Sequence, residues 1–349
     1  MQRTTSFGSV IVERITGNPA ASVVMVGSLV LAVVIGVFGG AAQLVNAVVT
    51  GGMWALLAVG LALIFGVANV PYFAHGESFM IGAYVAFFVF DPIKTYLQDN
   101  SNPLLFALGP FAAVLAAGVV GFALGVGLER LLFYPLRQRT KAGEWVMNAF
   151  LLTLGISFVI INGTTLVLGP NFQGIPYYWA VDPLELESLE VRVTVDRLVS
   201  FGIAIITIVA LWFFLRRTRI GRAIRAVAQD EVGAQLVGIN LNFVYVLTFG
   251  LATATAAIAG ASLLSIFQAY PTVGLIPLYT AWYVVILAGL GNVAGAIAGG
   301  FIVALLQTAT QQWVGIGWAN VVPIAAMVLV LLIVPSGIFG SEVKGVQEQ

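Results

Sequence analysis

The stretch GGMWALLAVGLALIFGVANVPYFAHGESFMIGAYVAF, residues 51–87, contains two apolar segments separated by a short interruption. The first belongs to an apolar run, Gln43–Val67, that is long enough to cross a membrane as a helix, since a span needs about 20 mostly apolar residues. In the interruption, Pro71 lacks a backbone N–H and disfavours helix at the preceding residue, and Gly76 offers a flexible junction. A shorter apolar segment, Glu77–Phe90, follows. The stretch therefore predicts a membrane helix, a break and a second helix.

The composition indicates a membrane protein. Of the 349 residues, 60% are hydrophobic and 9% are charged, against about 25% charged in soluble domains, and the mean hydropathy is +1.02. One histidine and no cysteine argue against disulfides, thiol nucleophiles and Cys/His metal sites. The amino end resembles a signal peptide in part, but its apolar run, Ala20–Phe38, is near spanning length, so we expect a retained span.

Ten membrane segments are predicted in total. Because backbone polar groups must be paired within a span, and no barrel-type alternation is present, the predicted fold is an all-α polytopic bundle with interrupted helices. Seven segments fit the length of a span: Ala20–Phe38, Gln43–Val67, Leu104–Leu131, Val146–Leu168, Leu198–Leu215, Phe243–Phe267 and Asn320–Pro335. Three are shorter or interrupted: Glu77–Phe90, Leu278–Leu290 and Ala294–Gln311.

The charges of the loops predict the orientation. Lys and Arg concentrate in cytoplasmic loops, so YPLRQRTKAGE and RRTRIGRAIRAVAQDE are expected inside, and the acidic DPLELESLEVRVTVDR is expected outside. Ten segments then place both termini in the cytoplasm, and Glu129 and Arg130 fall at the cytoplasmic boundary. The predicted organisation is a cytoplasmic amino end at 1–19, a transmembrane domain at 20–337 with an extracytoplasmic loop at 170–197 and a cytoplasmic loop at 216–242, and a cytoplasmic tail at 338–349.

Two breaks at membrane depth, Val67–Gly76 and Gly289–Asn292, should be packed in protein or line a water-filled cavity. Glu77 is expected in the first turn of a helix, where a carboxylate complements the positive helix end; alternatively it lines a path and meets an ammonium group. His75 either hydrogen-bonds backbone or relays protons, although a relay would usually have further ionisable groups. The candidate path residues are Asn69, Tyr72, His75, Glu77, Gly289 and Asn292.

The arginine-rich loop predicts a short amphipathic helix. Ile220, Ile224 and Val227 recur at helical spacing, and Gly233 and Gly238 punctuate the segment. Two interpretations stay open. The arginines could meet anionic lipid headgroups, or the apolar face could dock into a groove on a soluble partner.

Further along, GRAIRAVAQDEVGAQLVGINLNFVYVLTFGLATATAAIAGA resembles the signature of the integral membrane permeases of branched-chain amino acid (LIV-type) ABC importers, whose urea and short-amide relatives share the pattern. The stretches ERLLFYPLR, LLTLGISFVIINGTTLVLGP and LAGLGNVAGAIAGGFIVALLQ, together with residues 51–87, resemble the family in the same order. The amino-terminal span departs from many relatives. The resemblance implies that the loop couples the permease to an ATPase through Ala226, Val227, Gln229, Asp230, Glu231, Ala234, Leu236 and Gly238.

The resemblance also implies the partners. The chain has no GxxxxGK[ST] phosphate loop, so ATP would be bound by separate ATPase subunits and the chain itself would carry no cofactor and no enzymatic site. A second related permease or a second copy, an extracytoplasmic solute-binding protein, a small-molecule substrate and membrane lipids would complete the assembly, without nucleic acid, in the plasma (inner) membrane of a prokaryote. Urea or amide transport, a proton-coupled carrier using His75 and Glu77, and a structural scaffold are the competing interpretations.

Overall fold

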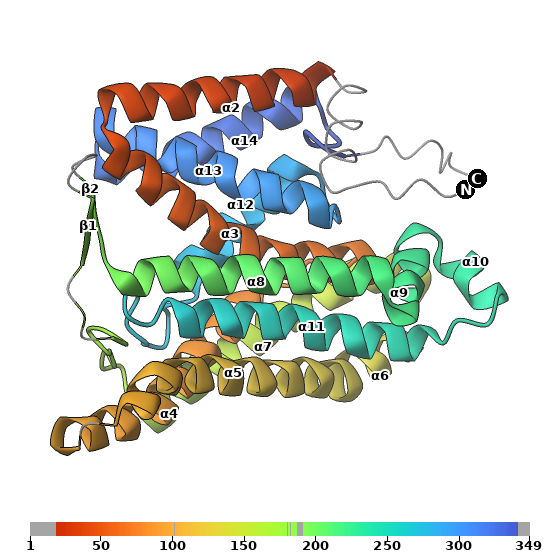
Figure 1. Ribbon diagram of the computed structural model, residues 1–349. Coiled ribbons are helices and arrows are strands. Elements are labelled where there is room, and N and C mark those ends of the chain that lie inside the picture. Colours follow the sequence, from red (N-terminus) through yellow and green to blue (C-terminus); the bar gives the residue numbers. More distant parts are fainter. Residues whose placement is uncertain (1–18, 101, 180, 182, 187–190, 341–349) are drawn as a thin grey trace.

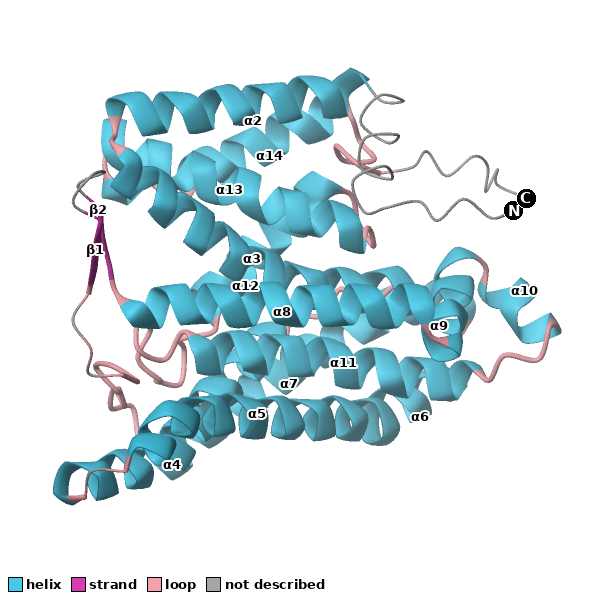
Figure 2. Ribbon diagram, in the orientation of Figure 1, coloured by secondary structure: helices cyan, strands magenta, loops and turns pink. Residues whose placement is uncertain are grey.

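The computed structural model describes residues 19–340 other than 101, 180, 182 and 187–190. Within this part of the chain, one short antiparallel hairpin, β1 (Leu184–Leu186) with β2 (Val191–Val193), accompanies a bundle of helices (Figure 2). The helices are α2 (Pro19–Phe38), α3 (Ala41–Ala68), α4 (His75–Asp99), α5 (Pro103–Leu128), η1 (Glu129–Phe133), α6 (Tyr134–Arg139), η2 (Ala142–Glu144), α7 (Trp145–Leu168), α8 (Val195–Arg217), α9 (Arg219–Gln229), α10 (Glu231–Leu236), α11 (Leu241–Ser262), α12 (Leu275–Ala288), α13 (Val293–Trp313), η4 (Ile316–Trp318) and α14 (Val321–Ile333). The predicted all-α membrane bundle is confirmed.

Nine helices of the described residues are long and apolar enough to cross a membrane. The tenth predicted segment is α12, whose 14 residues rise only about 21 Å at 1.5 Å per residue. Two predicted boundaries were wrong: α4 continues past Phe90 to Asp99, and α11 ends at Ser262 before the predicted Phe267. After α11 the chain forms irregular turns, and Ala269 pairs with Gln173 of the loop after α7.

Helix α3 lies at the centre of the bundle (Figure 1). It packs against α13, α11, α12 and α8, and 83% of its spanning window is buried, compared with 11% for α2, α7 and α14. A second contact region joins α5 to α11 and α4. There, Gly121 brings the α5 backbone close to α11, because a Cβ at this position would lie 2.9 Å from the Thr253 carbonyl oxygen. The most buried helices therefore form the inner layer, and α2, α7 and α14 form its periphery.

The two ends of the bundle carry different elements. Helices α9 and α10 lie at one end and the β1–β2 hairpin lies at the other (Figure 1). The end with α9 and α10 carries the arginine-rich sequence, and the loop charges predict that this is the cytoplasmic end. Helix α2 begins and α14 finishes at this same end, as an even number of membrane segments requires.

Candidate functional site

The first predicted break lies between α3 and α4. Helix α3 ends at Ala68, and Asn69 turns the chain out of the helix with a left-handed φ of 51°. Pro71 cannot extend the helix because it has no N–H to donate. The chain continues without helix until His75, where α4 begins. The interruption predicted within Val67–Gly76 is therefore present.

Helix α7 shows how deep this break reaches. At the start of α7, the indole N–H of Trp145 donates to the Ala68 carbonyl oxygen at 3.1 Å. Farther along, Thr153 donates to a carbonyl oxygen of the break, and Ser157 Oγ donates to Glu77 Oε1 at 2.6 Å. The rise from Trp145 to Ser157 is about 18 Å, in a hydrocarbon core of about 30 Å. The break thus runs from the cytoplasmic end of α7 to about the middle of the bundle.

His75 is fully buried against α3. Its Nε2 lies 2.9 Å from the Leu57 carbonyl oxygen, so this nitrogen carries the proton and donates it. Space for the ring depends on Gly60, where a Cβ would lie 3.0 Å from His75 Cε1. Tyr72 is also buried and meets the His75 ring edge-on, with centroids 6.0 Å apart. Of the two interpretations of His75, a hydrogen bond to backbone or a proton relay, this contact fits the first.

Glu77 lies in the first turn of α4, as predicted, and is only 2% exposed. Its Oε1 accepts the hydrogen bond from Ser157, whereas Oε2 has no hydrogen-bond partner among the described residues. The positive end of α4 stabilises a carboxylate here. Ser157 was missed by the sequence analysis. The available signal was the polar pair Thr153 and Ser157, which are four residues apart and so lie on one face of the otherwise apolar stretch 149–161 of α7.

The second predicted break joins α12 to α13. Gly289 and Gly291 have positive φ values of 103° and 77°, a conformation that favours glycine. Asn292 starts α13, because its Oδ1 accepts from the Gly295 N–H at 2.9 Å. Its Nδ2 donates to the Phe339 carbonyl oxygen at 2.7 Å, and two backbone hydrogen bonds join the same segment to the end of α12. The segment after α14 is thereby held against the break.

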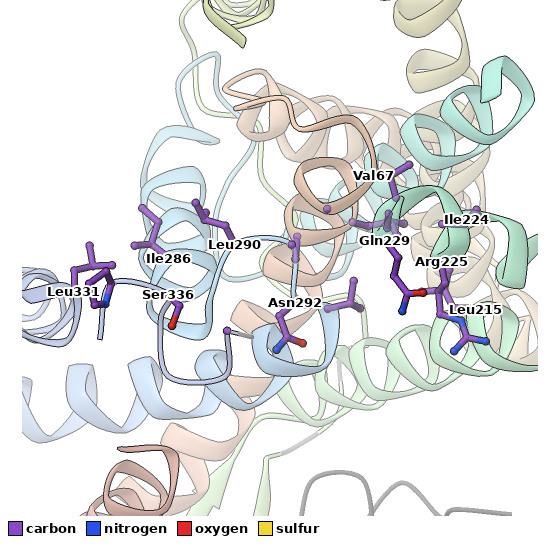
Figure 3. A pocket seen from close by; sticks show the side chains of 18 residues that line it. Val67, Leu215, Ile224, Arg225, Gln229, Ile286, Leu290, Asn292, Leu331 and Ser336 are labelled. Atoms are coloured by element: carbon purple, nitrogen blue, oxygen red, sulfur yellow. The ribbon is translucent and has the colours of Figure 1, made fainter. Parts of the chain in front are cut away.

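A cavity of about 780 Å³ lies beside the second break at the cytoplasmic end. Its walls come from the end of α3, from α9, from the second break and from the segment after α14. Figure 3 shows Val67, Ile224, Gln229, Asn292 and Ser336 around it. Arg225 of α9 is the one charged residue among the described residues that line it. The cavity has a largely apolar wall with a few amide and hydroxyl groups.

The candidate path residues form two groups. Asn292 lines the cavity and Gly289 is buried beside it, whereas the four residues of the first break do not line it: Asn69, Tyr72, His75 and Glu77. Of these four, Asn69 is exposed and the others are buried. The second break nevertheless lies against the last turns of α3, because a Cβ on Gly66 would lie 2.8 Å from the Gly291 carbonyl oxygen.

The arginine-rich loop forms two helices, where one was predicted. Helix α9 ends at Gln229 because Asp230 is extended and caps α10, its Oδ1 accepting from the Gly233 N–H at 3.0 Å. Gly233 therefore lies inside α10 and does not end the first helix, which corrects the prediction. Gly238, with φ of 84°, does end α10.

The candidate coupling residues point in two directions. Val227 and Ala234 are buried together with Ile224, and Ala226 is half-buried, so one face of the loop packs onto the bundle. The remaining candidates are exposed: Gln229, Asp230, Glu231, Leu236 and Gly238. Three large apolar side chains project from the tip around α10, with exposed fractions of 68% for Val232, 83% for Leu236 and 77% for Val237. The tip is an unpaired apolar surface at the cytoplasmic end.

The interfacial position predicted for Glu129 was wrong. Glu129 begins the π-helical turn η1 and is fully buried, whereas Arg130 is exposed as expected. Arg137 Nη1 lies 3.0 Å from Glu129 Oε1, and this ion pair compensates the buried carboxylate. The π-helical turn places Glu129 inside the bundle, where it meets Arg137, a residue that was predicted to lie in the following cytoplasmic loop.

Arg137 is also the centre of an aromatic cluster. Its guanidinium carbon lies 3.7 Å from the centroid of the Tyr245 ring in α11 and 5.1 Å from that of Trp145 in α7. Glu231 in α10 lies near the Tyr245 side chain. Trp145 in turn donates to the Ala68 carbonyl oxygen. Side-chain contacts therefore connect Tyr245 of α11, near the loop tip, with the first break.

Comparisons with known proteins place the chain among transport permeases. A family described as branched-chain amino acid transport system, permease component, matches residues 43–331. The permease protein LivH of the high-affinity branched-chain amino acid transport system of Salmonella typhimurium is 31% identical over 303 residues, covering 85% of this chain and 94% of LivH. BraD of Pseudomonas aeruginosa, named for the same type of system, is 30% identical over 301 residues, covering 85% of this chain and 95% of BraD. A probable LivH of Methanocaldococcus jannaschii is 26% identical over 306 residues, covering 86% and 92%. No solved structure gives a significant match.

Proposed function

Because this chain belongs to the family of branched-chain amino acid permease components, we propose that it is the membrane subunit of an ABC importer and forms the path for leucine, isoleucine or valine. The curated relatives named for this transport cover most of the chain, and the chain covers most of them. It is a multi-pass protein of the inner membrane. Substrate delivery and energy come from partners.

The partners follow from what the chain lacks and what it exposes. Its sequence has no GxxxxGK[ST] phosphate loop, so separate ATPase subunits would bind and hydrolyse ATP. A second related permease, or a second copy of this chain, would complete the membrane part, and an extracytoplasmic binding protein would deliver the substrate. Transport would proceed by alternating access, in which two conformations open the path to opposite sides.

The observation that carries this proposal is the tip of the arginine-rich loop. The side chains of Val232 and Leu236 in α10, and of Val237 directly after it, are exposed at the predicted cytoplasmic end and form a surface that fits an apolar groove on an ATPase subunit. A lipid-binding helix would instead present arginines and apolar residues along one interfacial helix. The tip is a separate helix, α10, and it carries no arginine.

The contacts behind the tip give the coupling a physical route. A displaced α10 would act on Tyr245 through Glu231, and on Trp145 through Arg137, which stacks on both rings. Trp145 holds the last carbonyl group of α3 where the first break begins. Helix α9 forms a wall of the 780 Å³ cavity, so its movement would also change the cytoplasmic cavity.

Charge reversal at the tip tests the proposal. We expect Glu231→Arg to insert and fold normally, and to uncouple ATP hydrolysis from leucine uptake in proteoliposomes that contain the assembled importer. Gly238→Trp, at the end of α10, should act in the same way, because the φ of 84° at this position disfavours any residue with a side chain and the substitution would displace the tip. Lys141→Glu is the matched control, since this residue is exposed on the same side but outside the loop.

Two results would contradict the proposal. Normal uptake by Glu231→Arg would favour a helix that rests on lipid headgroups. Leucine flux through the isolated chain, without ATP or ATPase subunits, would favour a self-sufficient carrier.

A further inference from the structure

Two small cavities adjoin each other at the end of the bundle that carries the β1–β2 hairpin. The outer one, of about 150 Å³, lies between the start of α3 and the β2–α8 segment. The inner one, of about 200 Å³, lies deeper between α3, the turns after α11 and the end of α13. Asn46 and Arg197 line both cavities, and Arg197 Nη1 donates to Asn46 Oδ1 at 2.5 Å. This hydrogen bond therefore stands at the boundary between the two spaces.

Arg197 has no acidic partner among the described residues, whose ion pairs are Glu129 with Arg137 and Glu185 with Arg192. The carboxylate next to it in sequence, Asp196, is engaged elsewhere, because it accepts from the backbone N–H groups of the Tyr178–Trp179 segment. A guanidinium has five N–H donors in a planar fork that matches a carboxylate. A half-buried arginine that faces a cavity and, among the described residues, bonds only a neutral amide is suited to an anionic ligand with this geometry.

The other residues of the inner cavity indicate which groups the ligand carries besides its carboxylate. An apolar wall is supplied by Met53, Leu263, Ile266 and Phe267, and none of the described residues that line the cavity is acidic. Thr50 and Gln311 add neutral oxygen atoms, which can accept hydrogen bonds from an ammonium group. A volume of about 200 Å³ equals that of about seven water molecules at about 30 Å³ each, which suits a ligand of fewer than about ten heavy atoms.

The polar residues at the base of the cavity are fixed by one another. Trp54 Nε1 donates to Gln307 Oε1 at 2.8 Å, and Gln307 Nε2 donates to Asn320 Oδ1 at 3.0 Å. Trp54 also lies 6.4 Å from the Phe267 ring, measured between centroids. Because the Gln307 amide is already engaged at both ends, the ligand-binding groups that remain are those of Arg197, Thr50 and Gln311.

We propose that the inner cavity is a receiving site for a free aliphatic α-amino acid, in which Arg197 binds the carboxylate and the apolar wall holds the side chain. This inference rests on the proposed function and adds the place where the substrate first enters the chain. The incoming carboxylate replaces Asn46 as the partner of Arg197, which opens the boundary between the outer and inner cavities. Trp54 lines the inner cavity, so its fluorescence should change when a ligand is bound there.

The test measures tryptophan fluorescence of the full chain in lipid nanodiscs during titration with L-leucine. The Trp54→Phe variant gives the background from the other tryptophans. We expect a saturable Trp54 signal with L-leucine and none with leucinamide, which keeps the side chain and the amine but lacks the carboxylate. Arg197→Gln should weaken leucine binding roughly tenfold or more, since it removes a charge-assisted bidentate contact.

Asn46→Ala separates ligand binding from a structural role of Arg197. If Arg197 binds the ligand, releasing it from Asn46 strengthens leucine binding. If the Arg197–Asn46 bond only supports the fold, Asn46→Ala weakens binding as Arg197→Gln does, and the proposal is wrong. Equal binding of leucinamide, or no saturable signal, also overturns it. If the assembled importer with Arg197→Gln takes up leucine with an unchanged KM, the receiving site is wrong while the proposed function stands. If the assembled importer with the unmodified chain takes up no amino acid, the proposed function itself is wrong.

Discussion

The two helix breaks solve the same physical problem in different ways. A non-helical segment at membrane depth must be packed in protein or border a water-filled space. The first break is packed: α7 bonds its start, its middle and Glu77, and His75 bonds α3. The second break, Gly289–Asn292, borders the 780 Å³ cavity and is held by Asn292 and the segment after α14. We therefore expect the first break to be rigid and intolerant of substitution, and the second to have room to move.

The largest expected effect is at Gly76, in the first turn of α4 directly after the packed break. A Cβ here would lie 2.5 Å from the Gly274 carbonyl oxygen and 3.0 Å from Leu278 Cβ, so the backbone of α4 would have to shift. We expect Gly76→Val to destabilise the protein by about 3 kcal/mol or more, at or beyond the upper end of overpacking costs, and to abolish the monodisperse peak of a fluorescent fusion in size-exclusion chromatography.

Gly155→Val is the matched control for this change. Gly155 is also in a helix, but it is exposed and a Cβ there meets nothing within 4 Å. Both variants carry the same cost of a β-branched residue in a helix. Equal yield and equal thermal midpoint for the two variants would show that the first break is not tightly packed.

The next effect separates the shape of Glu77 from its charge. Glu77→Ala removes the acceptor of the half-buried Ser157 hydroxyl, and we expect a cost of about 1 kcal/mol, at the lower end of the range for an unpaired buried polar group. Glu77→Gln keeps an oxygen for Ser157 and should retain most leucine uptake and thermal stability. Ser157→Ala should resemble Glu77→Ala in stability. If Glu77→Gln is stable but inactive, the carboxylate charge has a role in the path and the packed break is more than a support.

The sequence predicted the breaks better than the contacts around them. Apolar length and the positions of Pro71, Gly289 and Gly291 were sufficient to place the interruptions, because proline and glycine act on the local backbone. The partners that fix the first break come from α7 and α3, and no local rule places Ser157 beside Glu77. The burial of Glu129 likewise depends on rings from α7 and α11 around Arg137.

One error was avoidable from the sequence. Asp230 precedes EVGAQL, and an aspartate followed by a short run of helix formers is a common helix start. A second helix at α10 could have been predicted on that basis. The exposed tip, in contrast, required the tertiary structure, because the sequence does not show which apolar residues of the loop face the bundle.

The smallest effect is expected at the second break. Asn292→Ala removes the cap of α13, which costs about 1 kcal/mol, and it also releases the Phe339 carbonyl group. Asn292→Asp keeps an acceptor for the Gly295 N–H but cannot donate to Phe339, so it tests the second contact alone. We expect both variants to fold, and both to raise hydrogen exchange at the backbone N–H groups of Ile338 and Phe339, which bond the last carbonyl groups of α12. The neighbouring cavity gives the segment after α14 room to move, so hydrogen exchange of its amides should rise while the amides of α4 stay protected. If protection is lost equally at both breaks, the two breaks open as one unit and the contrast between them does not hold.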